Sequence, residues 1–272
     1  MEKYVYLKGA FVKESQAKVS VQERGFRFGD GLFETIRVNN GKLYQYKAHI
    51  NRLQKGLKAL RITYNIDDLE AIFKELIVKN SVKEGFVRLS ISRGIGSVGY
   101  LPNVRGRATI VVETVDPVKD ITEPIDLWLS SYNKIPDSCL PVATKTMQGL
   151  NSTLARIEAK ENSCFEALLM DIDGKICEGS SSNIFWVKDN VLYTPKSNVL
   201  LGTIREAVIR ISPYRVIQGD FSINDLKMAS EVFMTNVAWL IVPVRSLKPN
   251  NLKWSKFEVC KKIRELLKYD IS

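Results

Sequence analysis

The chain has 272 residues, of which 45% are hydrophobic and 26% charged, and its net charge is +10. This length and composition are typical of a globular protein of about two domains and not of a disordered or fibrous protein. One histidine and four cysteines without a C-x-x-C pair argue against a zinc site and against a serine–histidine or cysteine–histidine nucleophile. The lysines are scattered and no apolar run is long enough to cross a bilayer, so we expect a cytoplasmic protein without nucleic-acid or membrane partners.

The first part of the chain alternates short strands with two helices. Period-two patterns and turn residues predict strands at 4–7, 32–38, 42–46, 86–93 and 108–115. Apolar residues at helical spacing predict one helix at 48–62 and a second from about Asp67 to Ile77. The polar stretch 116–124 has a proline near each end, and it is predicted to link an N-terminal domain at 1–115 to a C-terminal domain at 125–272.

The second part of the chain contains more strands than helices. Strands are predicted at 125–131, 165–171, 175–178, 183–187, 191–194 and 231–235, and helices at 151–162, 204–211 and 255–268. Because the strands succeed one another as hairpins more than as βαβ units, we predict an α+β fold of two α/β domains with mostly antiparallel sheets.

Lys145 is the first candidate for chemistry. It is placed at the junction of a strand and a loop and is flanked by small and apolar residues in the segment 142–151, so its amine could be partly desolvated. Desolvation lowers the pKa of an amine and makes it a usable nucleophile toward an aldehyde. On this segment alone the signal is weak, because most lysines in such a chain are simply solvated at the surface.

Three further segments place polar groups at a strand end or a helix start. Glu178 ends a predicted strand just before the small residues 179–183, where the backbone can approach a ligand closely. Gly202 precedes a predicted helix, whose first N–H groups can bind a phosphate. Another strand ends at Asn236. Taken singly, each segment is also compatible with an ordinary loop, helix start or strand end.

Together with residues 24–37 and 49–53, these four segments resemble the fold-type IV family of enzymes that use pyridoxal 5′-phosphate (PLP). The family includes branched-chain aminotransferases, D-amino acid aminotransferases and aminodeoxychorismate lyases, and the resemblance extends over essentially the whole chain. It implies a D-amino acid aminotransferase-like architecture with the cofactor between the two domains. It also implies a homodimer in which a loop of the partner subunit closes the site, and residues 94–100 are the candidate for substrate contacts.

By the same resemblance, Lys145 is the catalytic residue, the Schiff-base lysine that binds PLP and then moves a proton on the substrate. Glu178 is similar to the carboxylate that faces the pyridine nitrogen and keeps it protonated, so that the ring can accept electrons. Arg52 is similar to the family's phosphate arginine, whose planar fork suits an anion.

Two turns complete the phosphate site that the resemblance implies. Thr203 and Ile204 match the pair that offers backbone N–H groups at a helix start, although the family more often has these two residues in the opposite order. Asn236 and Val237 match the second turn. Relatives often have threonine where this chain has Val237, so only the backbone N–H of that residue can serve.

Finer likenesses point to a reaction. Segments 32–37, 91–96 and 231–236 look closer to aminodeoxychorismate lyases, which predicts release of pyruvate from 4-amino-4-deoxychorismate to give the folate precursor 4-aminobenzoate. The alternative is an aminotransferase that passes the amino group of a branched-chain or D-amino acid to a 2-oxo acid. Against that alternative, D-amino acid enzymes are expected to bind a carboxylate in the loop that contains Val98 here, and branched-chain enzymes usually have Ile-Arg-Pro at 87–89. Contacts to the small-molecule amino substrate are assigned to Phe33, Arg37, Arg88, Arg93 and Tyr100.

Overall fold

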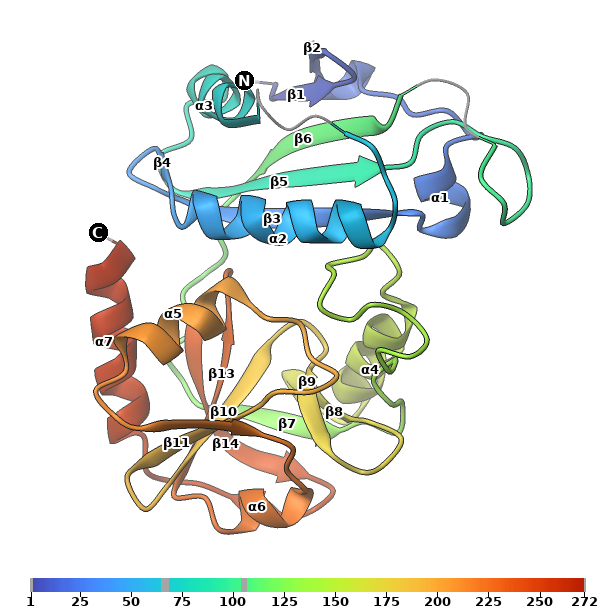
Figure 1. Ribbon diagram of the computed structural model, residues 1–272. Coiled ribbons are helices and arrows are strands. Elements are labelled where there is room, and N and C mark those ends of the chain that lie inside the picture. Colours follow the sequence, from blue (N-terminus) through green and yellow to red (C-terminus); the bar gives the residue numbers. More distant parts are fainter. Residues whose placement is uncertain (1, 65–68, 104–106, 272) are drawn as a thin grey trace. The chain divides into compact units, whose positions relative to one another are not determined.

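The computed structural model describes residues 2–64, 69–103 and 107–271, and it divides into two compact units (Figure 1). The first unit comprises Met1–Val118 together with Thr144–Gln148, and the second comprises Lys119–Ala143 together with Gly149–Ser272. The predicted α+β architecture with mostly antiparallel sheets is confirmed. The domain boundaries predicted at 115 and 125 stay a prediction, but the segment that contains Lys145 packs with the first unit.

The first unit is built on a six-stranded antiparallel sheet in the order β2-β1-β6-β5-β3-β4. Its strands are β1 (Tyr4–Leu7), β2 (Ala10–Lys13), β3 (Gly31–Asn39), β4 (Lys42–Leu43), β5 (Gly85–Ser92) and β6 (Thr109–Val115). Its helices are the short η1 (Glu14–Gln16) and α1 (Arg24–Phe28), and the longer α2 (Tyr46–Ala59) and α3 (Leu69–Lys79). The start expected for the last helix, near Asp67, lies outside the described residues.

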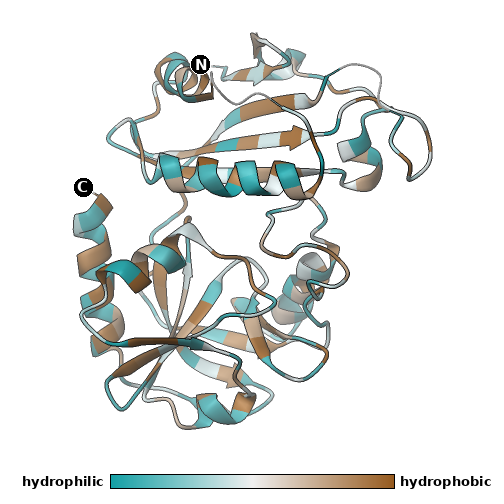
Figure 2. Ribbon diagram, in the orientation of Figure 1, coloured by the Kyte–Doolittle hydropathy of each residue, from teal (hydrophilic) through white to brown (hydrophobic). Residues whose placement is uncertain are grey.

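The period-two pattern of β3 gives this sheet two different faces. Leu32, Ile36 and Val38 are buried in the core that α2 and α3 cover, as expected for residues that alternate in direction along a strand. Helix α2 contributes its apolar stripe to that core, and its outer face is polar in Figure 2. The intervening residues of β3, among them Phe33 and Arg37, are only half-buried and lie on the opposite face of the sheet.

The segment around Lys145 pairs with the start of β3. The backbone N–H of Phe33 donates to the Lys145 carbonyl at 2.9 Å, and the N–H of Met147 donates to the Gly31 carbonyl at 2.9 Å. Glycine is required at position 31 because a Cβ there would stand 2.6 Å from the Ile91 carbonyl oxygen and 2.9 Å from the Met147 sulfur. The chain therefore positions Lys145 through backbone bonds that do not depend on its side chain.

The second unit is built on a nine-stranded sheet in the order β12-β11-β10-β13-β14-β7-β8-β9, with β15 paired to β14. Its strands are β7 (Ile125–Leu129), β8 (Glu166–Met170), β9 (Ile176–Gly179), β10 (Asn183–Lys188), β11 (Val191–Pro195), β12 (Val216–Gly219), β13 (Glu231–Asn236), β14 (Leu240–Lys248) and β15 (Leu252–Lys253). Its helices are α4 (Leu150–Glu161), α5 (Thr203–Ile211), α6 (Ile223–Lys227) and α7 (Glu258–Ile271). The pairs β11–β12, β14–β7 and β7–β8 are parallel, and the others are antiparallel.

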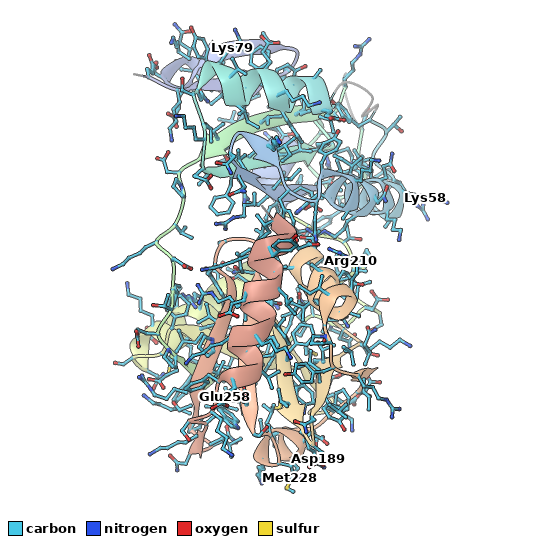
Figure 3. The ribbon with its side chains drawn as sticks, turned by 90° about the vertical axis from the view of Figure 1, so that its left-hand side faces the viewer. Lys58, Lys79, Asp189, Arg210, Met228 and Glu258 are labelled. Carbon is cyan, nitrogen blue, oxygen red and sulfur yellow. The ribbon has the colours of Figure 1, made fainter. Side chains whose placement is uncertain are left out.

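Two helices cover the buried strands at the centre of this sheet. Helix α7 runs beside α5 (Figure 3), and Arg210 of α5 binds Asp270 of α7 at 2.7 Å. The start of α7 is capped from the sheet, because the buried Glu231 carboxylate accepts the N–H groups of Val259 and Cys260, both at 3.1 Å. Across the described residues, no helix is both long and apolar enough to span a membrane.

Candidate active site

Lys145 lies against an aromatic ring on the half-buried face of the first sheet. Its ammonium nitrogen is 4.6 Å from the centroid of the Phe33 ring, and the guanidinium carbon of Arg88 is 4.1 Å from the same centroid. Such contacts hold a cation over the electron-rich face of a ring. Strand β5 places Arg88 there, since Arg88 pairs with Thr35 two residues beyond Phe33 along β3.

The predicted substrate residues Phe33, Arg37 and Arg88 share this face with Lys145. Arg37 stands over the Phe86 ring at 5.7 Å. Glu113 of the neighbouring β6 lies 3.7 Å from Arg88, and burial lowers the pKa of the Arg88 guanidinium. The structure thus brings together an amine, two arginines and an apolar ring, which is a surface suited to a small substrate that carries a carboxylate.

The other two predicted substrate residues lie elsewhere. Arg93 donates to the Asp30 carboxylate at 2.8 Å and to the carbonyls of Leu60 and Arg61 at 2.8 and 2.9 Å. Its three nitrogens therefore all bind neighbouring parts of the first unit. The side chain of Tyr100 is exposed.

A buried arginine that the sequence reasoning missed shapes the candidate substrate loop at 94–100. Arg24 is 3% exposed, and it donates to the carbonyls of Gly99 and Tyr100 at 2.9 and 3.1 Å and to Asp30 at 2.7 Å. These bonds fix the backbone of the loop, while the side chains of Val98 and Tyr100 are exposed.

The buried carboxylate of Glu34 orients the guanidinium of Arg52. Its Nε and Nη2 atoms donate to the two oxygens of Glu34 at 2.7 and 2.6 Å, and His49 Nδ1 lies 2.7 Å from the same carboxylate. Burial acts to raise the pKa of Glu34, but the hydrogen bonds of Arg52 and His49 outweigh it and lower that pKa to about 2. Burial lowers the pKa of His49, so the ring is neutral at pH 7 and Nδ1 must donate to the anionic carboxylate.

The low pKa of Glu34 predicts a stability change in acid. Because the folded-state pKa of about 2 lies below the ordinary 4.5, the ionised carboxylate stabilises the fold fully above about pH 5, and this contribution of about 3 kcal/mol is lost as the pH falls toward 2. We expect Glu34→Gln to be less stable at pH 7 and to lose less unfolding free energy between pH 5 and pH 3. Urea unfolding across this pH range measures the difference.

The matched control for this prediction is Glu75→Gln, which removes an exposed carboxylate of α3. The control should show the pH dependence of the unchanged protein, because it keeps the contact between Glu34 and His49. A Glu34→Gln protein whose unfolding free energy falls with acid as steeply as that of the control would contradict the assignment.

In the second unit, Glu178 is the next-to-last residue of β9, and its carboxylate is buried. One oxygen accepts the side-chain amide of Asn183 at 3.0 Å and the backbone N–H of Leu200 at 2.9 Å. The other oxygen lies 2.6 Å from the ammonium of Lys134. Three donors therefore surround this carboxylate, an arrangement that suits its anionic form.

The start of helix α5 lies beside the same amide. The Asn183 side chain also donates to the Leu200 carbonyl at 2.8 Å, and a Cβ at Gly202 would collide with the Asn183 oxygen. Gly202, the N-cap residue of α5, has no side chain that could cap the helix. The buried Thr203 and Ile204 thus begin a helix with the positive end of its dipole toward this region, as an anion site requires.

The turn at Asn236 belongs to the same end of the sheet, because Thr235 pairs with Asn183 across β13 and β10. The Asn236 side chain accepts the N–H groups of Ala238 and Trp239 at 2.9 and 3.0 Å, so it shapes the turn that contains Val237. The Thr235 hydroxyl is buried and has no hydrogen-bond partner among the residues that the structure describes.

The three serines after Glu178 attach their loop to a buried carboxylate of strand β8. The hydroxyls of Ser180, Ser181 and Ser182 all donate to Glu166, which is fully buried and which Arg156 also approaches at 3.2 Å. The sequence suggested only that small residues let a ligand approach here. The structure adds that their hydroxyls fix the loop between Glu178 and Asn183.

Comparison with known proteins gives matches to one family over nearly the whole chain. A family model described as amino-transferase class IV matches residues 31–247. A putative branched-chain-amino-acid aminotransferase of Methanocaldococcus jannaschii is 34% identical, covering 97% of this chain and 95% of its own. An aminodeoxychorismate lyase of Bacillus subtilis is 28% identical, covering 98% and 94%. Among solved structures, the Escherichia coli branched-chain amino acid aminotransferase has a TM-score of 0.93 at 27% identity, covering 100% of this chain and 95% of that chain.

Proposed function

The chain belongs to the class IV aminotransferase family, and from that premise we propose that it transfers the amino group of a branched-chain amino acid to a 2-oxo acid. The observation that carries the proposal is the similarity of 34% over almost the full length to a relative named for this activity, against 28% for the lyase. The sequence motifs favoured the lyase as the main prediction. The comparisons instead support the alternative, an aminotransferase, better than the lyase.

Enzymes of this family use PLP, which when bound supplies an aldehyde for an amine and a ring that accepts electrons. The described residues fit such a group. The buried Glu178 carboxylate suits a protonated ring nitrogen, and the helix start of α5 behind a glycine N-cap suits a phosphate. The Thr235 hydroxyl, which has no partner among the described residues, belongs to β13. Thr235 pairs with Asn183 of β10, whose side-chain amide binds Glu178.

We assign residues of both units to one cofactor because the chain belongs to this family. Lys145 would bind the aldehyde and then move the proton at the α-carbon of the substrate. Arg52, aimed by Glu34, and the backbone N–H groups at Thr203, Ile204, Asn236 and Val237 would bind the phosphate. Glu178 would hold the proton on the ring nitrogen.

The substrate side of the proposal rests on the face around Phe33. Its ring offers an apolar surface for a branched side chain, and Arg37 and Arg88 offer charge to a carboxylate of the amino acid or the 2-oxo acid. For the loop at 94–100 we propose contacts in a homodimer, as in the family, since Val98 and Tyr100 expose large apolar side chains there.

The experiment that tests this function separates the three reactions. We expect L-leucine or L-valine, added to the PLP-loaded enzyme, to give the corresponding 2-oxo acid and to shift the cofactor absorbance to that of the pyridoxamine form. D-alanine should do so poorly. Release of pyruvate and 4-aminobenzoate from aminodeoxychorismate, with no 2-oxo acid needed, would instead establish the lyase and overturn the proposal.

A further inference from the structure

Lys134 is a partly buried cation that neither the sequence motifs nor the proposed mechanism uses. It lies between β7 and α4 in the second unit, and its backbone N–H donates to the Met170 carbonyl at 2.8 Å. Its side chain is only 16% exposed and ends 2.6 Å from the Glu178 carboxylate. Both ends of this lysine are therefore fixed, one to the end of β8 and the other to the end of β9.

Lys134 and the other donors bind different oxygens of Glu178. Asn183 and Leu200 donate to Oε2, and Lys134 bonds to Oε1. A carboxylate oxygen has two lone pairs, so Oε1 can accept from a further group while Lys134 remains bonded. The lysine thus orients Oε1 and leaves one lone pair of that oxygen available to accept a hydrogen bond from a ligand.

The remaining charges near Glu178 do not bond to it directly. Arg205 of α5 interacts with Glu178 only at longer range, and it is paired with Glu206. The neighbouring Cys177 stays a neutral thiol, since burial, Asp171 and Glu178, together with Asp220, raise its pKa to about 12. Lys134 is therefore the cation in direct contact with this carboxylate within the described part of the chain.

A carboxylate holds a proton on a ring nitrogen through its negative charge, and a cation bonded to the same carboxylate offsets part of that charge. We propose that Lys134 is a positioning residue that acts on the cofactor through Glu178, so that the ring nitrogen releases its proton at a lower pH than it would beside Glu178 alone. This inference rests on the proposed function, because it requires PLP at Glu178. The electron demand of the ring is then set by two residues of the chain.

The test monitors the proton on the ring nitrogen rather than the rate. PLP labelled with ¹⁵N in the ring is bound to the unchanged enzyme, to Lys134→Met and to Lys134→Arg, and the ¹⁵N resonance is recorded against pH. We expect the titration midpoint of Lys134→Met to move up by about one pH unit, as expected for loss of one nearby charge. Lys134→Arg keeps the charge and should stay within a few tenths of a unit.

A matched control removes another ion pair of the second unit. Arg245 binds Asp126 at 2.6 Å at the surface, and Arg245→Met should leave the titration unchanged. Where Lys134→Met does not fold, Lys134→Gln retains a hydrogen-bond donor without the charge and is expected to show the same upward shift.

The outcomes separate this inference from the proposed function. If PLP binds Lys134→Met or Lys134→Gln and the midpoint does not move, Lys134 is only a structural partner of Glu178 and the inference is overturned, while the proposed function stands. A purely structural role would lower the melting temperature of both variants and leave the titration in place. Absence of PLP on Lys145 in the unchanged enzyme would overturn the function itself.

Discussion

Replacing Lys145 by alanine is expected to abolish amino transfer, with a loss of about 10⁴-fold in kcat, because the same amine is assigned the covalent bond to the cofactor and the proton transfer. The fold should survive, since the backbone bonds of this segment to Phe33 and Gly31 do not involve the lysine side chain. The visible absorbance of the lysine-bound cofactor should disappear in the variant. Steady-state kinetics and the absorbance spectrum measure both effects.

The site of attachment can be checked independently of the rate. Borohydride reduction of the unchanged enzyme should fix the cofactor on the peptide that contains Lys145. The matched control is Lys58→Ala, which removes a lysine from the outer face of α2 (Figure 3) and should keep full activity and colour. Attachment to another lysine, or near-normal turnover by Lys145→Ala, would refute the assignment.

Local patterns were sufficient for much of the first unit. The predicted helix at 48–62 is observed as Tyr46–Ala59, and the predicted strand at 86–93 as Gly85–Ser92, because period 3.6 and period 2 report which face is buried. The predicted strand at 32–38 is observed within β3, where the alternation puts Phe33 and Arg37 on one face. The direction in which a strand residue points was therefore accessible from the sequence.

Short elements gave no such signal. Helix α1 has five residues, too few for a hydrophobic period to appear. It exists because the Glu23 side chain accepts the N–H of Phe26 at 3.2 Å and because Gly29 ends the helix with a left-handed φ of 62°. Both are local contacts that composition does not reveal.

The partners of the key residues lie far away in the sequence. Glu34 and Arg52, like Lys134 and Glu178, meet only when separate elements pack, so a motif reveals one member and not the other. Arg93 likewise meets its partners only in the folded chain: Asp30 and the carbonyls after α2 bind its guanidinium. Its assignment to the substrate stays a prediction. The resemblance to a family therefore identified candidate residues, and the tertiary contacts show what holds them.

Glu178→Gln is the second substitution for which we expect a large effect, a loss of about 10²- to 10³-fold in kcat/KM. The amide oxygen of glutamine would accept from Asn183 and Leu200, the two donors that now bind one oxygen. Its NH₂ group would then replace the oxygen that bonds to Lys134. An NH₂ group can neither pair with that ammonium nor hold a proton on a ring nitrogen. The variant therefore loses both the negative charge and the hydrogen-bond acceptor at this position. Kinetics with L-leucine and 2-oxoglutarate measure the loss, and the exposed Glu161→Gln in the same unit is the matched control.

The double variant Glu178→Gln, Lys134→Met decides whether that loss comes from chemistry or from structure. Removing the ammonium relieves the contact between two donors, so the melting temperature should recover at least in part. The activity should not recover, because the variant has no anion at the position that we assign to the partner of the ring nitrogen. A double variant that regained most of the kcat/KM of the unchanged enzyme would show that Glu178 matters only as the partner of Lys134, and its assignment to the cofactor would have to be withdrawn.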